Sequence, residues 1–143
     1  MTTIRKSTTI AAPPEKIWDY FGDPTHLPEI WPSMLEVTDV EKLADGGRHY
    51  HWLYKMAGVK FEGETETVEL VPKERLVDKT KGGIESTFVW AFKPENGGTK
   101  VELEVDYKVP VPLVGKLAET FIAKLNEREA DTVLANLKDR MEV

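Results

Sequence analysis

The sequence predicts an α+β fold in which a curved antiparallel sheet of seven strands surrounds one long C-terminal helix. Three observations lead to this fold class. The chain begins with a strand at residues 4–10 and two short helical segments, ends with a helical run over residues 113–141, and reads as strands in between. A sheet with two helices at its start and one long helix at its end packs most economically by curling around the last helix. Such an arrangement usually leaves a hollow between the sheet and that helix.

The composition is that of an ordinary globular chain and excludes several classes of function. With 143 residues, of which 41% are hydrophobic and 31% charged, we expect a single domain over residues 1–143. The absence of cysteine excludes disulfides, thiolate metal ligands and a cysteine nucleophile, and it suits a cytoplasmic location. A net charge of −6 argues against a nucleic-acid partner, which requires clustered lysine and arginine. The apolar runs are too short for a membrane-spanning helix, so we expect no integral membrane association.

Prolines define the two short helices near the start of the chain. Pro13 and Pro14 fit the first turn of a helix, where a missing N–H costs little. Asp23 is placed to cap a second helix that has Pro24 at its first position, and Pro32 ends it. The sequence therefore predicts two separate short helices before the main run of strands.

Alternating apolar and polar residues predict six further strands. They cover residues 34–43, 48–56, 59–71, 75–80, 84–92 and 99–109. A tight turn at Ala57 and Gly58 places Trp52 opposite Gly63, where the absent side chain leaves room for the indole. The apolar phase changes next to Thr67, which predicts a β-bulge that bends this long strand.

The last helix carries two apolar stripes instead of one. The first stripe contains Val114, Leu117, Ala118, Phe121 and Leu125, and the second contains Ala130, Val133, Leu134, Leu137 and Met141. At about 100° per residue the two are displaced by well over a right angle, so one flat surface cannot bury both. We expect the two halves of the helix to pack on different parts of the curved sheet. The alternatives are a mobile cover hinged at Pro110, Pro112 and Gly115, or a Val114/Phe121 patch that contacts a second copy, a membrane or a protein partner.

The order of elements and several N-terminal residues resemble a known superfamily. Residues 12–18, together with Asp23-Pro24, His26-Leu27-Pro28 and Trp31-Pro32, are similar to the N-terminal signature of bacterial and archaeal START-like proteins, also called SRPBCC or helix-grip proteins. Residues 134–138 resemble the end of their C-terminal helix. The resemblance covers the whole chain and points to the polyketide cyclase/dehydrase or coenzyme Q-binding branch. It implies a helix-grip fold with a deep apolar cavity that holds a lipid-like or aromatic small molecule.

Aromatic residues cluster on the inward faces of the predicted strands. Read as structure, most of these rings fill the core; read as function, several line a ligand cavity in which a few polar groups orient the ligand. The candidate ligand-binding residues are Tyr50, Trp52, Tyr54, Phe61, Ser86, Phe88, Trp90, Tyr107, Phe121 and Leu125. We expect the hydroxyl groups among them to supply the polar contacts.

Two histidines raise the question of a metal site. His49 and His51 share one strand face and lie across the predicted hairpin from Glu66 and Glu64. Two imidazoles and two carboxylates could ligate zinc or a similar ion. The same pattern is typical of a solvated sheet face with cross-strand charge pairs. On sequence grounds we prefer that interpretation and expect neither a metal nor a cofactor.

No motif identifies catalytic residues. A Ser-His-Asp spacing, a GxSxG elbow and a phosphate-binding loop are all absent from the sequence. Arg128 and Glu129 are the best acid–base candidates, provided that they face the cavity. Adjacent residues of a helix point in different directions, which argues against a pair that faces the cavity together. We therefore prefer to interpret them as a solvent-exposed ion pair.

The leading expectation is therefore a protein that binds or carries a small hydrophobic molecule between the sheet and the last helix. A quinone or isoprenoid, a fatty acyl chain and a polyketide-like aromatic all fit it, with residues 109–121 gating access. Two alternatives stay open: a cyclase or dehydratase that uses the same cavity, and a co-chaperone-like module that contacts a protein partner. The sequence leaves the question of catalysis undecided.

Overall fold

The structure of the protein is a computed structural model that describes residues 2–110 and 113–143. Its strands are β1 (Thr2–Ile10), β2 (Met34–Lys42), β3 (Arg48–Met56), β4 (Val59–Val71), β5 (Arg75–Gly82), β6 (Ser86–Glu95) and β7 (Gly98–Tyr107). Its helices are α1 (Pro14–Phe21), the 3-10 turn η1 (Pro24–His26), α2 (Leu27–Ile30) and α3 (Lys116–Met141). The predicted order of strand, short helices, six strands and long helix is confirmed.

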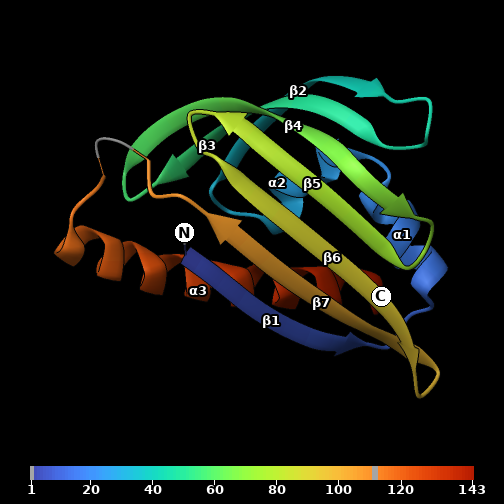
Figure 1. The fold of residues 1–143 in the computed structure, drawn as a ribbon. Coiled ribbons are helices and arrows are strands. Elements are labelled where there is room, and N and C mark those ends of the chain that lie inside the picture. The colour runs from blue at the N-terminus through green and yellow to red at the C-terminus, as the bar shows by residue number, and fades with distance from the viewer. Residues whose placement is uncertain (1, 111–112) are drawn as a thin grey trace.

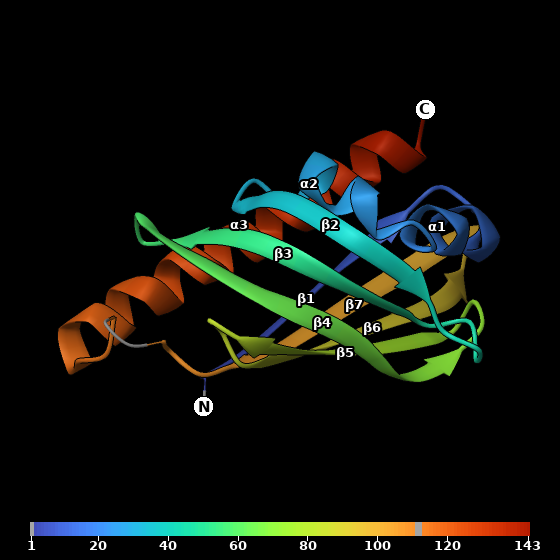
Figure 2. The same ribbon diagram turned by 90° about the horizontal axis from the view of Figure 1, so that it is seen from above.

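The seven strands form one antiparallel sheet in the order β1-β7-β6-β5-β4-β3-β2. Strands β2 to β7 follow one another as a meander, and β1 joins the sheet by pairing with β7. Figures 1 and 2 show the sheet curving around α3, with α1 and α2 on the same concave side. This is the helix-grip arrangement that the sequence predicts, and it leaves one sheet face toward the helices and the other toward solvent.

The hairpin between β3 and β4 has the predicted register. Trp52 pairs with Gly63, and a Cβ at position 63 would lie 2.4 Å from an indole carbon of Trp52. Glycine at this position therefore leaves the space that the ring occupies. The pairing of β4 with β5 shifts by one residue after Thr67, which confirms the predicted bulge. A bulge of this kind bends the strand that carries it.

The two halves of α3 behave differently, and the expectation that both pack on the sheet is wrong. All residues of the second stripe are buried, namely Ala130, Val133, Leu134, Leu137 and Met141. Most of the first stripe faces solvent, with Val114 54%, Leu117 90% and Phe121 59% exposed, and only Leu125 is half-buried. In Figures 1 and 2 this half of the helix extends past the edge of the sheet.

The start of α3 also differs from the prediction. The helix begins at Lys116 instead of Leu113, because Gly115 at its N-cap has φ of +140°, a backbone conformation that interrupts the helix. Pro112, one of the expected hinge residues, lies outside the described residues. Within the parts of the chain that the structure describes, no helix combines the length and the apolarity needed to cross a membrane.

Candidate functional site

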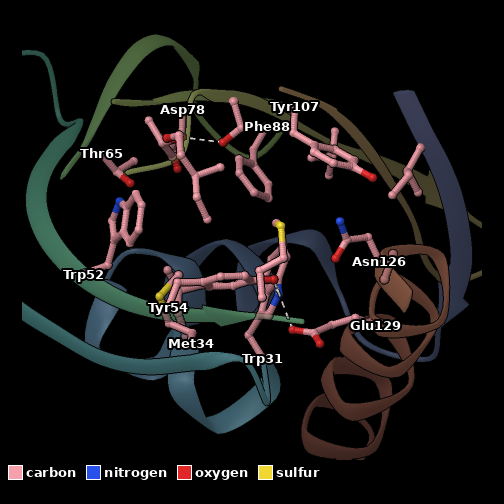
Figure 3. Close-up of a pocket in the computed structure, with 18 of the residues that line it drawn as sticks. Trp31, Met34, Trp52, Tyr54, Thr65, Asp78, Phe88, Tyr107, Asn126 and Glu129 are labelled. Carbon is pink, nitrogen blue, oxygen red and sulfur yellow. Dashed lines mark hydrogen bonds between the residues drawn. The ribbon is translucent and has the colours of Figure 1, made fainter. Parts of the chain in front are cut away.

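The concave face of the sheet and the middle of α3 enclose a cavity of about 80 Å³, shown in Figure 3. Strands β3 to β7 contribute side chains at alternate positions, since successive residues of a strand point to opposite faces. The aromatic residues that line the cavity are Trp31, Tyr50, Trp52, Tyr54, Phe88, Trp90 and Tyr107. The lining is thus dominated by rings, as in sites that bind nonpolar small molecules.

Most of the predicted ligand-binding residues line this cavity. They are Tyr50, Trp52, Tyr54, Ser86, Phe88, Trp90 and Tyr107. Phe61 is buried in the core but is not part of the lining, whereas Phe121 is exposed and Leu125 is half-buried outside it. The difference on α3 has a simple cause: the helix turns Asn126, Glu129 and Ala130 toward the cavity instead of the first apolar stripe.

Glu129 places a carboxylate at the cavity wall. One carboxylate oxygen accepts the Ser33 N–H at 3.1 Å and the Tyr54 hydroxyl at 3.2 Å, and the other accepts the Ser33 hydroxyl at 2.6 Å. The Trp31 indole N–H donates to the Tyr54 oxygen at 3.2 Å. In Figure 3, Tyr54 extends across the cavity toward Glu129. The expected solvent ion pair is wrong, because Glu129 faces inward while Arg128 is exposed.

Two phenols of the site remain protonated over the physiological range. Burial raises the pKa of Tyr50, and the carboxylate of Asp78 adds to the effect. Burial likewise raises the pKa of Tyr54, with a further contribution from Glu129. Both side chains are therefore neutral hydrogen-bond donors, and the Tyr54–Glu129 pair offers a positioned donor beside a carboxylate base.

A buried ion pair lies on the side of the cavity formed by β3, β4 and β5. Arg48 Nη2 donates to Asp78 Oδ2 at 3.0 Å, and the Thr67 hydroxyl donates to Asp78 Oδ1 at 2.8 Å. Arg48 also donates to the main-chain carbonyl of Phe21, the last residue of α1. Buried charges persist where they are paired and hydrogen-bonded. This network ties α1 to the sheet and is part of the framework of the cavity.

Three polar groups of the lining have no hydrogen-bond partner among the described residues, and one of them, Nε of Arg48, belongs to the buried ion pair. The other two are the indole nitrogen of Trp52 and the hydroxyl of Tyr107. Both side chains are buried, and buried polar groups in folded proteins are nearly always paired. In Figure 3 the amide of Asn126 projects from α3 on the same side of the cavity as Tyr107. These groups are the positions from which the protein can hydrogen-bond a ligand.

Sequence reasoning did not assign several polar residues of the site. Arg48 and Tyr50 are alternate residues of one strand and so point to the same face, and Thr65 lies opposite Tyr50 in the predicted register. Alternation alone could therefore have placed Arg48 and Thr65 inward. Asp78 and Asn126 carry no comparable signal, because their orientation depends on how β5 and α3 meet the rest of the fold. His49 and His51, in contrast, lie on the convex face and take no part in the cavity.

Comparison with known proteins gives matches over the whole chain. The family model described as polyketide cyclase / dehydrase and lipid transport matches residues 1–142. Among solved structures, TTHA0849 from Thermus thermophilus is 26% identical, with coverage of 98% of this chain and 97% of that chain and a TM-score of 0.77. No curated protein matches the chain.

Two more distant structures share the fold. Zhui aromatase/cyclase from Streptomyces sp. R1128 is 15% identical, with coverage of 99% of this chain and 93% of that chain and a TM-score of 0.82. A START superfamily protein from Mycobacterium smegmatis is 16% identical, with coverage of 98% of this chain and 97% of that chain and a TM-score of 0.80. At these identities the likeness concerns the fold alone.

Proposed function

The chain belongs to the polyketide cyclase / dehydrase and lipid transport family, which confirms the expected START-like membership, and on this premise we propose that it binds and carries a small hydrophobic molecule in the cavity between the sheet and α3. The observation that carries the proposal is the pair of buried uncharged donors without partners among the described residues, Trp52 Nε1 and Tyr107 OH, in a lining dominated by aromatic rings. Burial of apolar surface supplies the affinity, and the two donors orient the ligand.

The unpartnered donors narrow the class of ligand. A plain hydrocarbon would leave the Trp52 N–H buried without an acceptor, which costs about 1–3 kcal/mol. A molecule with an acceptor oxygen on an apolar frame satisfies it. Quinones, polyketide-like aromatics and the carbonyl end of an acyl chain all have this chemistry. We therefore favour an oxygenated hydrophobic ligand over a purely aliphatic one.

A small-molecule ligand needs more room than the cavity offers in this structure. A volume of about 80 Å³ is well below the roughly 300 Å³ at the lower end of small-molecule sites, so a ligand of that size has to displace part of the lining. The N-terminal half of α3 is the element best suited to move. Of its apolar residues, Ile122 is buried at 1% exposure, whereas Leu117 and Phe121 face solvent. Few buried contacts hold such a segment in place.

A matched pair of substitutions on α3 tests the binding proposal. Ala130 lines the cavity and Ala135 is exposed on the same helix. Ala130→Leu should fill the cavity and abolish binding of quinones, fatty acids and aromatic polyketides. Tryptophan fluorescence and thermal shift measure this binding. Ala135→Leu should bind like the unmodified protein. Equal binding by both variants would place the ligand elsewhere, and no binding of any of the three classes by the unmodified chain would contradict the proposal.

A cyclase or dehydratase is the second candidate, and the Glu129–Tyr54 contact favours it. The carboxylate can accept a proton and the phenol can hydrogen-bond a carbonyl oxygen of a bound substrate. Glu129→Gln separates the two functions because it keeps the shape of the side chain. A carrier retains binding with at most a modest loss of affinity, whereas an enzyme loses turnover of the molecule that it binds.

Two finer parts of the proposal concern location and partners. We place the carrier in the cytoplasm, because a chain without cysteine does not depend on an oxidising compartment. The exposed Val114, Leu117 and Phe121 side chains are the surface from which a homodimer or a protein partner would be recognised. Phe121→Asp should disrupt such a complex in analytical ultracentrifugation while leaving ligand binding in the cavity intact.

A further inference from the structure

The convex face of the sheet carries a second cluster of side chains, unrelated to the cavity and to the function proposed for it. We propose that His49, His51 and Glu64 form a binding site for a divalent late transition-metal ion of the Zn²⁺ class. The two histidines are alternate residues of β3, and His51 pairs directly with Glu64 of β4. Figure 2 shows β2, β3 and β4 side by side on this part of the sheet.

The spacing of the three side chains fits one metal ion. Nε2 of His51 lies 3.3 Å and Nε2 of His49 lies 3.5 Å from the same Glu64 oxygen, Oε2. Ligands bound to zinc at their usual bond lengths with tetrahedral angles are about 3.3–3.5 Å apart. All three ligand atoms lie within 4.8 Å of one another. Two imidazoles and one carboxylate thus form a three-ligand site whose fourth position faces solvent.

Asp39 supports one of the ligands from the neighbouring strand. His51 Nδ1 lies 3.0 Å from Asp39 Oδ2, and an ionised carboxylate can only accept, so His51 donates its Nδ1–H. In the metal-bound state the remaining ring proton therefore lies on Nδ1 and Nε2 gives its lone pair to the ion, as metal-bound histidines commonly require. Asp39 reaches this position through a register shift in the pairing of β2 with β3, where its φ is +52°.

A solvated charge cluster was the preferred interpretation of this face on sequence grounds. Two features that the sequence could not supply change the inference. The first is that both histidines converge on one oxygen of Glu64, and the second is the orienting contact from Asp39. Lys81 contacts the opposite oxygen, Glu64 Oε1, at 3.0 Å and leaves Oε2 to the metal. Glu66 pairs with His49 along the strands but is not among the clustered ligand atoms.

Isothermal titration of the full chain with ZnCl2 tests the site, and the third histidine of the chain supplies a matched control. The unmodified protein should bind one zinc ion. His51→Gln and His49→Gln should each abolish saturable binding, whereas His26→Gln should bind like the unmodified protein. Asp39→Asn should weaken binding about 10-fold, the lower end of the range for partners that orient a ligand, because this carboxylate is exposed.

Lys81→Met provides a variant expected to improve binding, since it removes a positive charge beside the carboxylate. Circular dichroism of each variant shows that the fold is kept. The visible spectrum of the Co²⁺-loaded protein adds a readout of geometry, with the intense bands of tetrahedral coordination expected. Absence of saturable zinc binding would overturn the proposal, and so would equal binding by His51→Gln and the unmodified chain. A Co²⁺ spectrum with the weak bands of octahedral coordination that persist in His49→Gln would overturn it as well.

Discussion

Asp78→Ala is expected to destabilise the protein strongly, because it leaves the buried guanidinium of Arg48 without its charged partner. Asp78 and Arg48 are 5% and 6% exposed at their side chains, and their Oδ2–Nη2 distance is 3.0 Å. Removing one partner of a buried ion pair typically costs about 3–5 kcal/mol. For a chain of 143 residues, 1 kcal/mol corresponds to about 3 °C in Tm, so the variant should melt roughly 10–15 °C lower.

Guanidinium unfolding followed by tryptophan fluorescence gives the free energy directly, and a surface pair supplies the control. Glu102 lies 2.9 Å from Lys93, but the two side chains are 37% and 64% exposed, so Glu102→Ala should cost no more than about 1 kcal/mol. The double variant Arg48→Met, Asp78→Leu should lose less stability than the sum of the two single variants. A cost below about 1 kcal/mol for Asp78→Ala would refute the buried network as a framework of the cavity.

Three further predictions concern the helix, the hairpin and the pH dependence of stability. Leu137→Ala on the buried stripe of α3 should lower the free energy of unfolding by about 2–5 kcal/mol. Leu117→Ala, at a position that is 90% exposed, should change it by less than about 0.5 kcal/mol. Equal effects would contradict the assignment of the two faces. Gly63→Ala should lower Tm and slow or prevent folding, because the new Cβ would lie 2.4 Å from both an indole carbon and a main-chain carbonyl oxygen. An unchanged melting curve would show that the hairpin packs differently. The Lys138 side chain holds the pKa of Glu142 below its ordinary value, so this carboxylate stabilises the fold above its unfolded pKa and ceases to do so as pH falls through the folded one. Melting curves from neutral to acidic pH should therefore show Glu142→Gln less stable than the unmodified protein only at the higher pH values.

The sheet was predictable because its signals are local. Alternation along each strand marks the inward residues, and the turn at Ala57 and Gly58 sets the register of β3 against β4. The pairing of Trp52 with Gly63 follows from that register without knowledge of the rest of the fold. Most of the cavity lining comes from these strands, so most of the candidate site could be read from the same pattern.

The parts that depend on α3 were not predictable in the same way. Helical periodicity shows which residues share a face, but it does not show what covers that face. The first stripe of α3 extends past the sheet, so Phe121 is exposed instead of lining the cavity. Glu129 turns inward because Ser33, in the loop after α2, supplies two hydrogen bonds to its carboxylate. Contacts between segments 96 residues apart leave no pattern in a single sequence.

Native mass spectrometry of the protein purified from its own host tests the central claim most directly. Gentle ionisation preserves a molecule held in an apolar cavity, and solvent extraction of the same sample then identifies its chemical class. The account predicts a one-to-one adduct that is an oxygenated hydrophobic molecule and that is missing from Ala130→Leu but present in Ala135→Leu. A bare protein mass, together with no thermal shift from quinones, fatty acids or aromatic polyketides, would contradict it.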